Sequence, residues 1–300
     1  MSFYHQLFTS NFELVKNCTM RKILIPTDFS ETSMNAIEYA LELFKYDKCE
    51  FIIMNAFADE VYNNTMEMDR EFFEEFKEKY RTSVENQLQK EVAIMLKRTS
   101  NPRHAYNFEA RFGSIVDEAN QIVERDNIDI VVMGTKGKTQ DKDITFGSIT
   151  LQVIKYVKCP VLAVPVGFHG APPKNILFPT DYMVPFNRRA LKLLSTMAKS
   201  FVANINMLFI SEFKQRSHRQ EDNRAFLDSC FNDNKVEFTQ TPGKDITEGI
   251  NKVLNEKEFD MLVMVNQRHS YLENILYHST IEKIGLEIKI PFLVMNNLHR

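Results

Sequence analysis

Residues 129–150 read DIVVMGTKGKTQDKDITFGSIT, and this stretch decides how the rest of the chain is interpreted. Its apolar run, residues 130–133, leads directly into Gly134. That pattern is typical of a strand that is buried on both faces of a parallel sheet and ends in a tight turn. Gly137 follows after two residues and Gly147 after nine more, so the stretch predicts a strand, a glycine loop and a second turn.

Residues 148–157 are predicted to form a helix with Ser148 as its N-cap. Glycine has no Cβ, so backbone N–H groups in such a loop can approach an anion closely, and the backbone can adopt positive φ angles. A helix N-terminus adds roughly half a positive charge. The loop and the helix together therefore predict a site for a polyphosphate ligand.

Two common phosphate-binding loops do not fit this spacing. Gly137-Lys138-Thr139 matches the end of a Walker A loop, but that motif requires glycine where this chain has Val132. A dinucleotide-binding fingerprint requires G-x-G-x-x-G directly after the first strand. Both classes are excluded.

The spacing that is present, G-x2-G-x9-G-[ST], resembles the nucleotide-binding motif of the universal stress protein family. Residues 22–28 (KILIPTD) are similar to the first strand of that family, and residues 159–164 (CPVLAV) are similar to its last strand. The resemblance spans residues 20–165. It implies a five-stranded parallel α/β sheet of the adenine nucleotide alpha hydrolase type, with the motif after the fourth strand.

The resemblance also implies which residues contact an adenine nucleotide. It places Pro26, Thr27 and Asp28 at the nucleoside and the backbone of Asn55 and Ala56 at the adenine. The ribose and phosphates are lined by Met133, Gly134, Lys136, Gly137, Gly147, Ser148, Ile149 and Thr150. Chemically, Asp28 can accept hydrogen bonds from ribose hydroxyls, Ser148 and Thr150 can donate to phosphate oxygens, and Lys136 adds positive charge.

Helix and strand patterns alternate between these motifs. A helix begins after Ser30, strands are predicted at residues 51–56 and 108–112, and a helix capped by Ser114 covers residues 115–125. A long charged helical tract lies between the two strands, with one apolar stripe: Phe73, Phe76, Tyr80, Val84, Leu88 and Val92. We interpret the stripe as packed on the sheet, with a partner-binding face as the alternative. The alternation predicts a doubly wound parallel sheet.

The chain then repeats itself. After FHGAPP (residues 168–173), residues 174–181 read KNILFPTD and match residues 22–28 closely. Such a repeat indicates two copies of one domain. We therefore predict an N-terminal extension (1–19), a nucleotide-binding domain (20–166), a linker (167–173) and a second, degenerate domain (174–300).

The second copy lacks the glycine loop. Aligned without gaps, Asp129 matches Asp260 and Pro160 matches Pro291, whereas the three glycines are replaced by Val265, Arg268 and His278. Side chains at these positions obstruct a close approach of backbone to phosphate, so we expect no nucleotide there. The alternative is an anion held by Arg268, His269 and His278. Asp181, the counterpart of Asp28, is expected only to cap the helix that follows it.

Composition limits the functional classes. The net charge of −3 gives no field that would attract nucleic acid or an anionic membrane, and the four scattered cysteines indicate reduced thiols. There is no secretory leader pattern, no apolar stretch of membrane-spanning length and no histidine cluster for a metal. We predict a cytoplasmic protein without nucleic-acid or membrane partners.

These observations favour an ATP-binding stress-response protein whose first domain holds the nucleotide, with Mg²⁺ accompanying it, and whose second domain is a structural partner. Family members pair through their last strands, so the resemblance implies that the two copies dock within the chain, and a homodimer stays open. One alternative is an interaction module without nucleotide. The other is a slow ATP-hydrolysing enzyme, although the loop shows no catalytic base: Asp141 and Asp143 lie in its nine-residue spacer.

Overall fold

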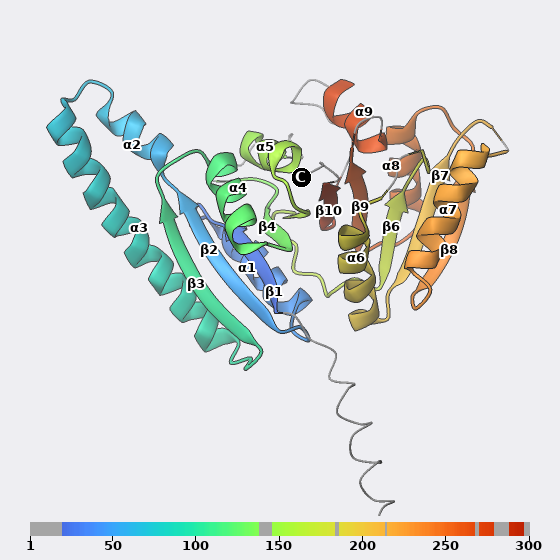
Figure 1. Cartoon of the computed structure of the whole chain (residues 1–300), viewed down its shortest axis with the longest axis horizontal. Helices are drawn as coiled ribbons and strands as arrows, with labels where there is room; N and C mark the ends of the chain where they lie inside the picture. The colour runs from blue at the N-terminus through green and yellow to red at the C-terminus, as the bar shows by residue number, and fades with distance from the viewer. Residues whose placement is uncertain are drawn as a thin grey trace, which may run out of the picture.

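The computed structural model describes residues 20–137, 146–183, 186–213, 215–267, 270–278 and 288–296. Within them the chain forms a first half, β1–β5, and a second half, β6–β10 (Figure 1). The first half contains β1 (Arg21–Pro26), α1 (Glu31–Leu43), β2 (Cys49–Ala56), α2 (Ala58–Thr65), α3 (Arg70–Arg98), β3 (His104–Arg111), α4 (Ile115–Asp126), β4 (Ile130–Gly134), α5 (Ser148–Tyr156) and β5 (Val161–Val164). The second contains β6 (Asn175–Pro179), α6 (Arg188–Phe201), β7 (Asn204–Ile210), α7 (His218–Cys230), β8 (Lys235–Thr241), α8 (Ile246–Glu256), β9 (Met261–Asn266), α9 (Tyr271–His278) and β10 (Phe292–Asn296).

The strands form one ten-stranded sheet in the order β3-β2-β1-β4-β5-β10-β9-β6-β7-β8. Every pair within a half is parallel, whereas β5 and β10 pair antiparallel at the centre. Leu162 lies opposite Leu293, the residue with which it aligns in the repeat. This register relates the two halves by an approximate two-fold axis through that pair. The predicted α/β fold with a parallel sheet is confirmed.

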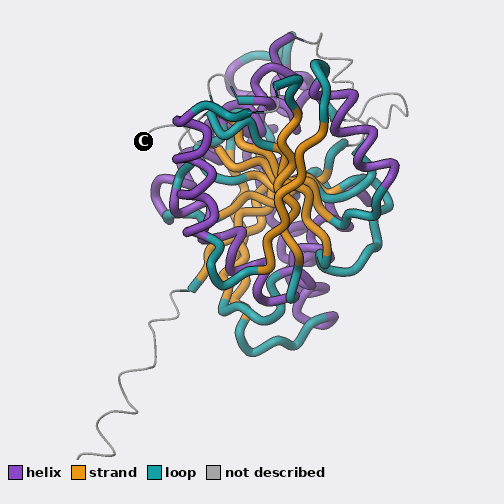
Figure 2. Tube along the Cα trace, turned by 90° about the vertical axis from the view of Figure 1, so that its right-hand side faces the viewer, coloured by secondary structure: helices purple, strands orange, loops and turns teal. Residues whose placement is uncertain are grey.

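Helices cover both faces of the sheet, and Figure 2 shows the strands running through the centre with helices on either side. One buried cluster joins one face of the sheet to α1, α3, α6 and α7. The other cluster joins the opposite face to α4, α5, α8 and α9. The central strands are therefore buried on both faces, which explains their continuous apolar runs. Within the described residues, no helix is both long enough and apolar enough to cross a membrane.

Several predicted elements differ in their bounds. The charged tract is two helices, because Asp69 accepts a hydrogen bond from Phe72 N (2.9 Å) and starts α3 anew. Its apolar stripe packs on the core, as interpreted from the sequence. Strand β3 begins at His104, four residues earlier than predicted, because it is an edge strand with polar side chains that hide the apolar alternation.

The helix caps were predicted with mixed success. Ser30 and Ser114 are the N-caps of α1 and α4, as predicted. The prediction for Ser148 was wrong: it is the first residue of α5, and Gly147 is the N-cap, which offers no side chain to the free N–H groups. Asp181 is not a helix cap either, because α6 is capped by Asn187.

Val202 gives a test of local backbone strain. It ends α6 in the left-handed conformation (φ 53°), and its side chain is 86% exposed, so packing does not compensate for a β-branched residue there. We expect Val202→Gly to raise the free energy of unfolding by about 1 kcal/mol. Asn127 ends α4 at φ 55°, and because asparagine tolerates this conformation, Asn127→Gly is the matched control with little gain. Denaturant unfolding of both variants measures the difference, and equal gains would contradict this explanation.

Candidate functional site

The order of the strands fixes where a site can form in the first half. From β1 the chain moves outward to β2 and β3, and then crosses back to β4 and β5. Helix α1 therefore covers one face of the sheet and α5 the other. In parallel α/β sheets, such a reversal opens a crevice beyond the carboxyl ends of the two central strands. The segments after β1 and β4 meet at this crevice.

The segment after β1 is held by its own hydrogen bonds. Thr27 N donates to Met54 O (2.8 Å), and Phe29 N donates to Thr27 Oγ1 (3.1 Å). Phe29 consequently adopts φ 63°, a conformation that is strained for a residue with a side chain. Asp28 Oδ1 accepts from Ser30 N (3.1 Å), so Asp28 supports the N-cap of α1 without being the cap.

The end of β2 supports the same segment. Asn55 Nδ2 donates to Thr27 O (2.7 Å), so the Asn55 side chain ties β2 to the segment after β1. The backbone of Asn55 and Ala56 lies beside it, and both residues are half-buried. Pro26 is the last residue of β1 and is buried. These residues form one wall of the crevice.

Gly134, the last residue of β4, and Gly137, in the segment after it, allow two close approaches. A Cβ on Gly134 would lie 2.6 Å from Thr32 Cγ2, and a Cβ on Gly137 would lie 2.8 Å from Asp28 Oδ2. The missing side chains thus bring the loop against α1 and against the Asp28 carboxylate. Neither approach depends on a positive φ angle, because among the described glycines only Gly167 has one.

Gly147 is different, because the packing of the protein does not require a glycine there. A Cβ at this position would meet its nearest neighbour, Lys136 Cα, at 3.6 Å, which is ordinary contact. Gly147 N donates to Thr135 O (2.8 Å), which fixes the entry into α5. The absence of a side chain at Gly147 leaves the N-terminus of α5 open to an approaching group.

The remaining predicted residues have separate positions. Ser148 and Ile149 are exposed in the first turn of α5, and Lys136 is half-buried within the loop. Thr150 is buried and donates to Gly134 O (3.0 Å). The Thr150 hydroxyl is therefore engaged inside the loop, contrary to its predicted role as a phosphate donor. Met133 is 6% exposed and packs with the core, so its side chain does not line the crevice.

Glu91 is a buried acid that the sequence interpretation did not single out. It lies on α3, is only 8% exposed and interacts with the Thr27 side chain. Its Oε2 has no hydrogen-bond partner among the described residues. Burial raises the pKa of Glu91 to about 7, the charge of Asp28 acts in the same direction, and the interaction with the Thr27 side chain opposes both. Glu91 follows Val84 by seven positions and Leu88 by three, so its place on the apolar stripe was the available signal.

The corresponding crevice of the second half is filled by side chains. Its β6 segment repeats that of β1: Tyr182 N donates to Thr180 Oγ1 (3.1 Å), and Tyr182 has φ 56°. Beyond it, Val265 and Tyr271 help to reduce the cavity to about 10 Å³. Tyr271 donates to Ile210 O (2.7 Å), and the burial of this region raises the pKa of Asp181.

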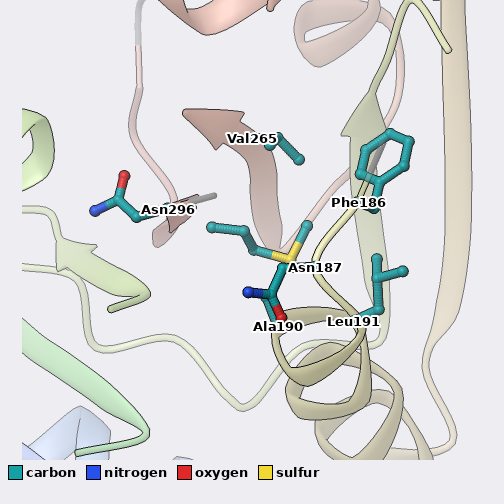
Figure 3. A pocket seen from close by; sticks show the side chains of 7 residues that line it. Phe186, Asn187, Ala190, Leu191, Val265 and Asn296 are labelled. Carbon is teal, nitrogen blue, oxygen red and sulfur yellow. The ribbon is translucent and has the colours of Figure 1, made fainter. Parts of the chain in front are cut away.

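Figure 3 shows Val265 and Phe186 at a neighbouring gap that leaves no space for a water molecule. Arg268 and His269, and the side chain of His278, lie outside the described residues, so the alternative of an anion held by them is untested.

Side chains of the second half hold the glycine loop and α5 in place. Phe146, next to Gly147, packs against Phe292 of β10 with ring centroids 5.6 Å apart. Asn266 Nδ2 donates to Ile154 O (3.1 Å), and Asn296 Nδ2 donates to Val157 O (2.6 Å). These amides satisfy carbonyl groups at the C-terminus of α5 that would otherwise be unpaired. The helix that starts at the crevice is thus fixed at its far end by the second half.

Comparison with known proteins identifies the family. The model of the universal stress protein family matches residues 19–165. Universal stress protein MJ0577 of Methanocaldococcus jannaschii is 31% identical over 157 residues, which are 48% of this chain and 94% of that protein. A universal stress protein of Methanothermobacter thermautotrophicus is 28% identical over 141 residues, covering 47% of this chain and 92% of that protein. The chain belongs to the universal stress protein family.

The solved structures extend the similarity of fold to both halves. The structure of a universal stress protein from Archaeoglobus fulgidus aligns with 92% of this chain and 96% of its own, with a TM-score of 0.64 and 18% identity. A putative universal stress protein from Pseudomonas aeruginosa aligns with 93% of this chain and 94% of its own, with a TM-score of 0.56 and 10% identity. At these identities the comparison establishes the fold alone.

Glu91 makes stability depend on pH. Its folded pKa of about 7 lies above the ordinary value of 4.5, so between these values the folded protein binds more protons than the unfolded chain. Stability therefore falls as pH rises through this window, and the loss is complete above about pH 7. We expect Glu91→Gln to raise the free energy of unfolding by about 1–2 kcal/mol at pH 8, a figure discounted for solvent screening, and by much less near pH 4.5. Urea unfolding across pH measures this. A gain that does not vary with pH would contradict the assignment.

Proposed function

We propose that this protein binds an adenine nucleotide, ATP with its accompanying Mg²⁺, in the crevice of the first half, and that the second half is a structural partner without a site. The main support is the close approach of Gly137 to Asp28, where a Cβ on Gly137 would lie 2.8 Å from Asp28 Oδ2, so that a carboxylate and a glycine loop face the same crevice. The carboxylate suits the hydroxyls of a ribose, and the loop suits phosphate groups. A ligand that carries both groups satisfies both sides.

In this proposal the phosphates approach the start of α5. Because Gly147 caps this helix without a side chain, the N–H groups of the first turn and the exposed Ser148 hydroxyl are available to an anion. Lys136 adds positive charge from the loop. Asn55 and Ala56 offer backbone groups to the adenine, in agreement with the use of the Asn55 side chain for Thr27. We assign no protein ligand to the Mg²⁺.

The role of the second half follows from its contacts. The volume of its own crevice is about 10 Å³, which is far less than a nucleotide requires. By contrast, the second half contacts α5 and the loop before it through Asn266, Asn296 and Phe292. We propose the predicted domain division on this basis, with 20–166 as the binding domain and 174–300 as its support. The interaction-module alternative differs in requiring no ligand, so binding measurements separate the two. Cytoplasmic location and homodimer formation stay predictions.

ATP should stabilise the protein. At a ligand concentration of about one hundred times the dissociation constant, binding adds about 2.7 kcal/mol to the free energy of unfolding, which raises the thermal midpoint by several degrees. Gly147→Ala is the matched probe, because its Cβ has room in the protein but lies where the phosphates approach. The variant should keep the midpoint of the parent without ligand and lose most of the ATP-induced rise. An unchanged midpoint of the parent at millimolar MgATP would refute the proposal.

Calorimetric titration should show one site per chain. Asp28→Ala removes an acceptor for a ribose hydroxyl and should weaken ATP binding by about 1.5–3 kcal/mol, which is roughly tenfold or more in affinity. Asp181→Ala is the internal control, because Asp181 ends the same Pro-Thr-Asp sequence beside a filled crevice. Its ATP affinity should match that of the parent. Two sites per chain, or equal losses in both variants, would show that the second half also binds nucleotide.

A further inference from the structure

Helix α3 is longer than the sheet that it covers. Its 29 residues span about 43 Å, whereas the eight residues of the edge strand β3 span about 26 Å. The buried side chains of α3 lie in its C-terminal part, between Val84 and Met95. In the other half of the protein, the 13 residues of α7 are enough to link β7 to β8. The N-terminal part of α3, together with α2, therefore projects beyond the sheet, and Figure 1 shows it at the outer corner of the first half.

The projecting corner carries four exposed apolar side chains, which we call the corner patch. Tyr62 lies on α2, Met66 and Met68 lie between the two helices, and Phe72 lies in the first turn of α3. The exposed fraction of these residues ranges from 41% for Phe72 to 82% for Met66. None of the four belongs to the apolar stripe of α3 that packs on the core. Apolar side chains that gather on an exposed surface mark a contact with another molecule.

Aromatic contacts give the corner patch a fixed shape. The ring centroid of Tyr62 lies 5.7 Å from that of Phe73 and 5.6 Å from that of Phe112, so α2 is held against α3 and against the end of β3. The ring of Phe72 stacks on that of Phe76, with centroids 6.2 Å apart. A preformed surface loses little conformational entropy when a partner binds, and the methionines can adapt to the shape of the partner.

Acidic side chains surround the corner patch. Residues 59–79 contain eight acidic and three basic residues, so this segment has a net charge of −5, whereas the whole chain has −3. The acidic residues of the segment are all exposed: Asp59, Glu60, Glu67, Asp69, Glu71, Glu74, Glu75 and Glu78. A surface of this sign repels anionic membranes and nucleic acids, and it attracts a partner with positive charge.

We propose that the corner patch is a docking site for a positively charged amphipathic helix of another protein, independently of nucleotide binding. The apolar stripe of such a helix covers the four apolar side chains, and its lysine or arginine residues pair with the acidic rim. Charge complementarity selects this occupant. A two-fold contact with a second copy of this chain would place two acidic rims against each other. A lipid surface would desolvate the acidic groups without pairing them.

The probe is a labelled synthetic peptide in which leucine and lysine follow a helical period, and its counterpart has glutamate in place of every lysine. Fluorescence anisotropy titrations use the full chain. The parent should bind the lysine peptide at least about tenfold more tightly than the glutamate peptide. Raising the salt concentration from about 50 mM to about 500 mM should weaken binding of the lysine peptide by about tenfold or more, because salt screens the attraction.

Two double variants separate the apolar contribution from the charged one. Met68→Ser/Phe72→Ser removes apolar anchors and should weaken binding of the lysine peptide by about tenfold or more. Glu71→Gln/Glu75→Gln should weaken binding at low salt and reduce its salt dependence. Phe213→Ser is the matched control, because Phe213 is 76% exposed but follows β7 in the other half. Its affinity should equal that of the parent.

Thermal midpoints without peptide verify that the variants are folded. A parent that binds neither peptide, or both equally, would overturn the inference, and so would an unchanged affinity of Met68→Ser/Phe72→Ser. Light scattering that shows a dimeric parent and a monomeric Met68→Ser/Phe72→Ser variant would assign the patch to a second copy of the chain instead. Phosphatidylcholine vesicles that bind the parent but not this variant would assign it to a lipid surface. Either result would overturn the proposed partner.

Discussion

The antiparallel pairing of β5 with β10 is the constraint on which the rest of the structure depends. Each half alone would end in a strand whose N–H and C=O groups lack partners along one edge, although both faces of that strand are buried. Pairing the two edges satisfies these groups and forms one continuous sheet. It also brings α5 and the end of β10 together, so that Asn296 can reach the carbonyls of Val157 and Cys159. The pairing of β5 with β10 thus helps to position α5 at the crevice.

The two crevices show how one backbone arrangement serves two purposes. In both halves a threonine hydroxyl accepts a hydrogen bond from the backbone N–H of the residue two positions later. That residue has a strained, positive φ angle, which is 63° for Phe29 and 56° for Tyr182. This conformation therefore does not depend on the glycine loop. The second half gains buried apolar area from Val265 and Tyr271, where the first half has an open loop. Packing and ligand access compete for the same space, and each half favours one of them.

Glu91 illustrates the same competition within the first half. A leucine on the stripe of α3 would pack without desolvating a carboxyl, so Glu91 destabilises the protein at neutral pH. Residues that break a local packing rule are concentrated at functional sites. Its neighbour Asp28 is on a different element and belongs to the Pro-Thr-Asp sequence. The pair exists only because α3 packs on β2 and β3, and β2 lies next to β1 in the sheet.

The sequence by itself determined the α/β class, the repeat, the glycine loop and the loss of that loop in the second copy. These features depend on local periodicity and on residue type: an apolar run predicts a buried strand, and glycine spacing shows where the backbone can approach a ligand. The tertiary structure alone decided that Thr150 donates to Gly134, that Glu91 meets Thr27, and that Asn266 and Asn296 hold α5. Each of these contacts joins side chains to groups on other elements. Their distances are set by strand order and helix packing, which local patterns do not contain.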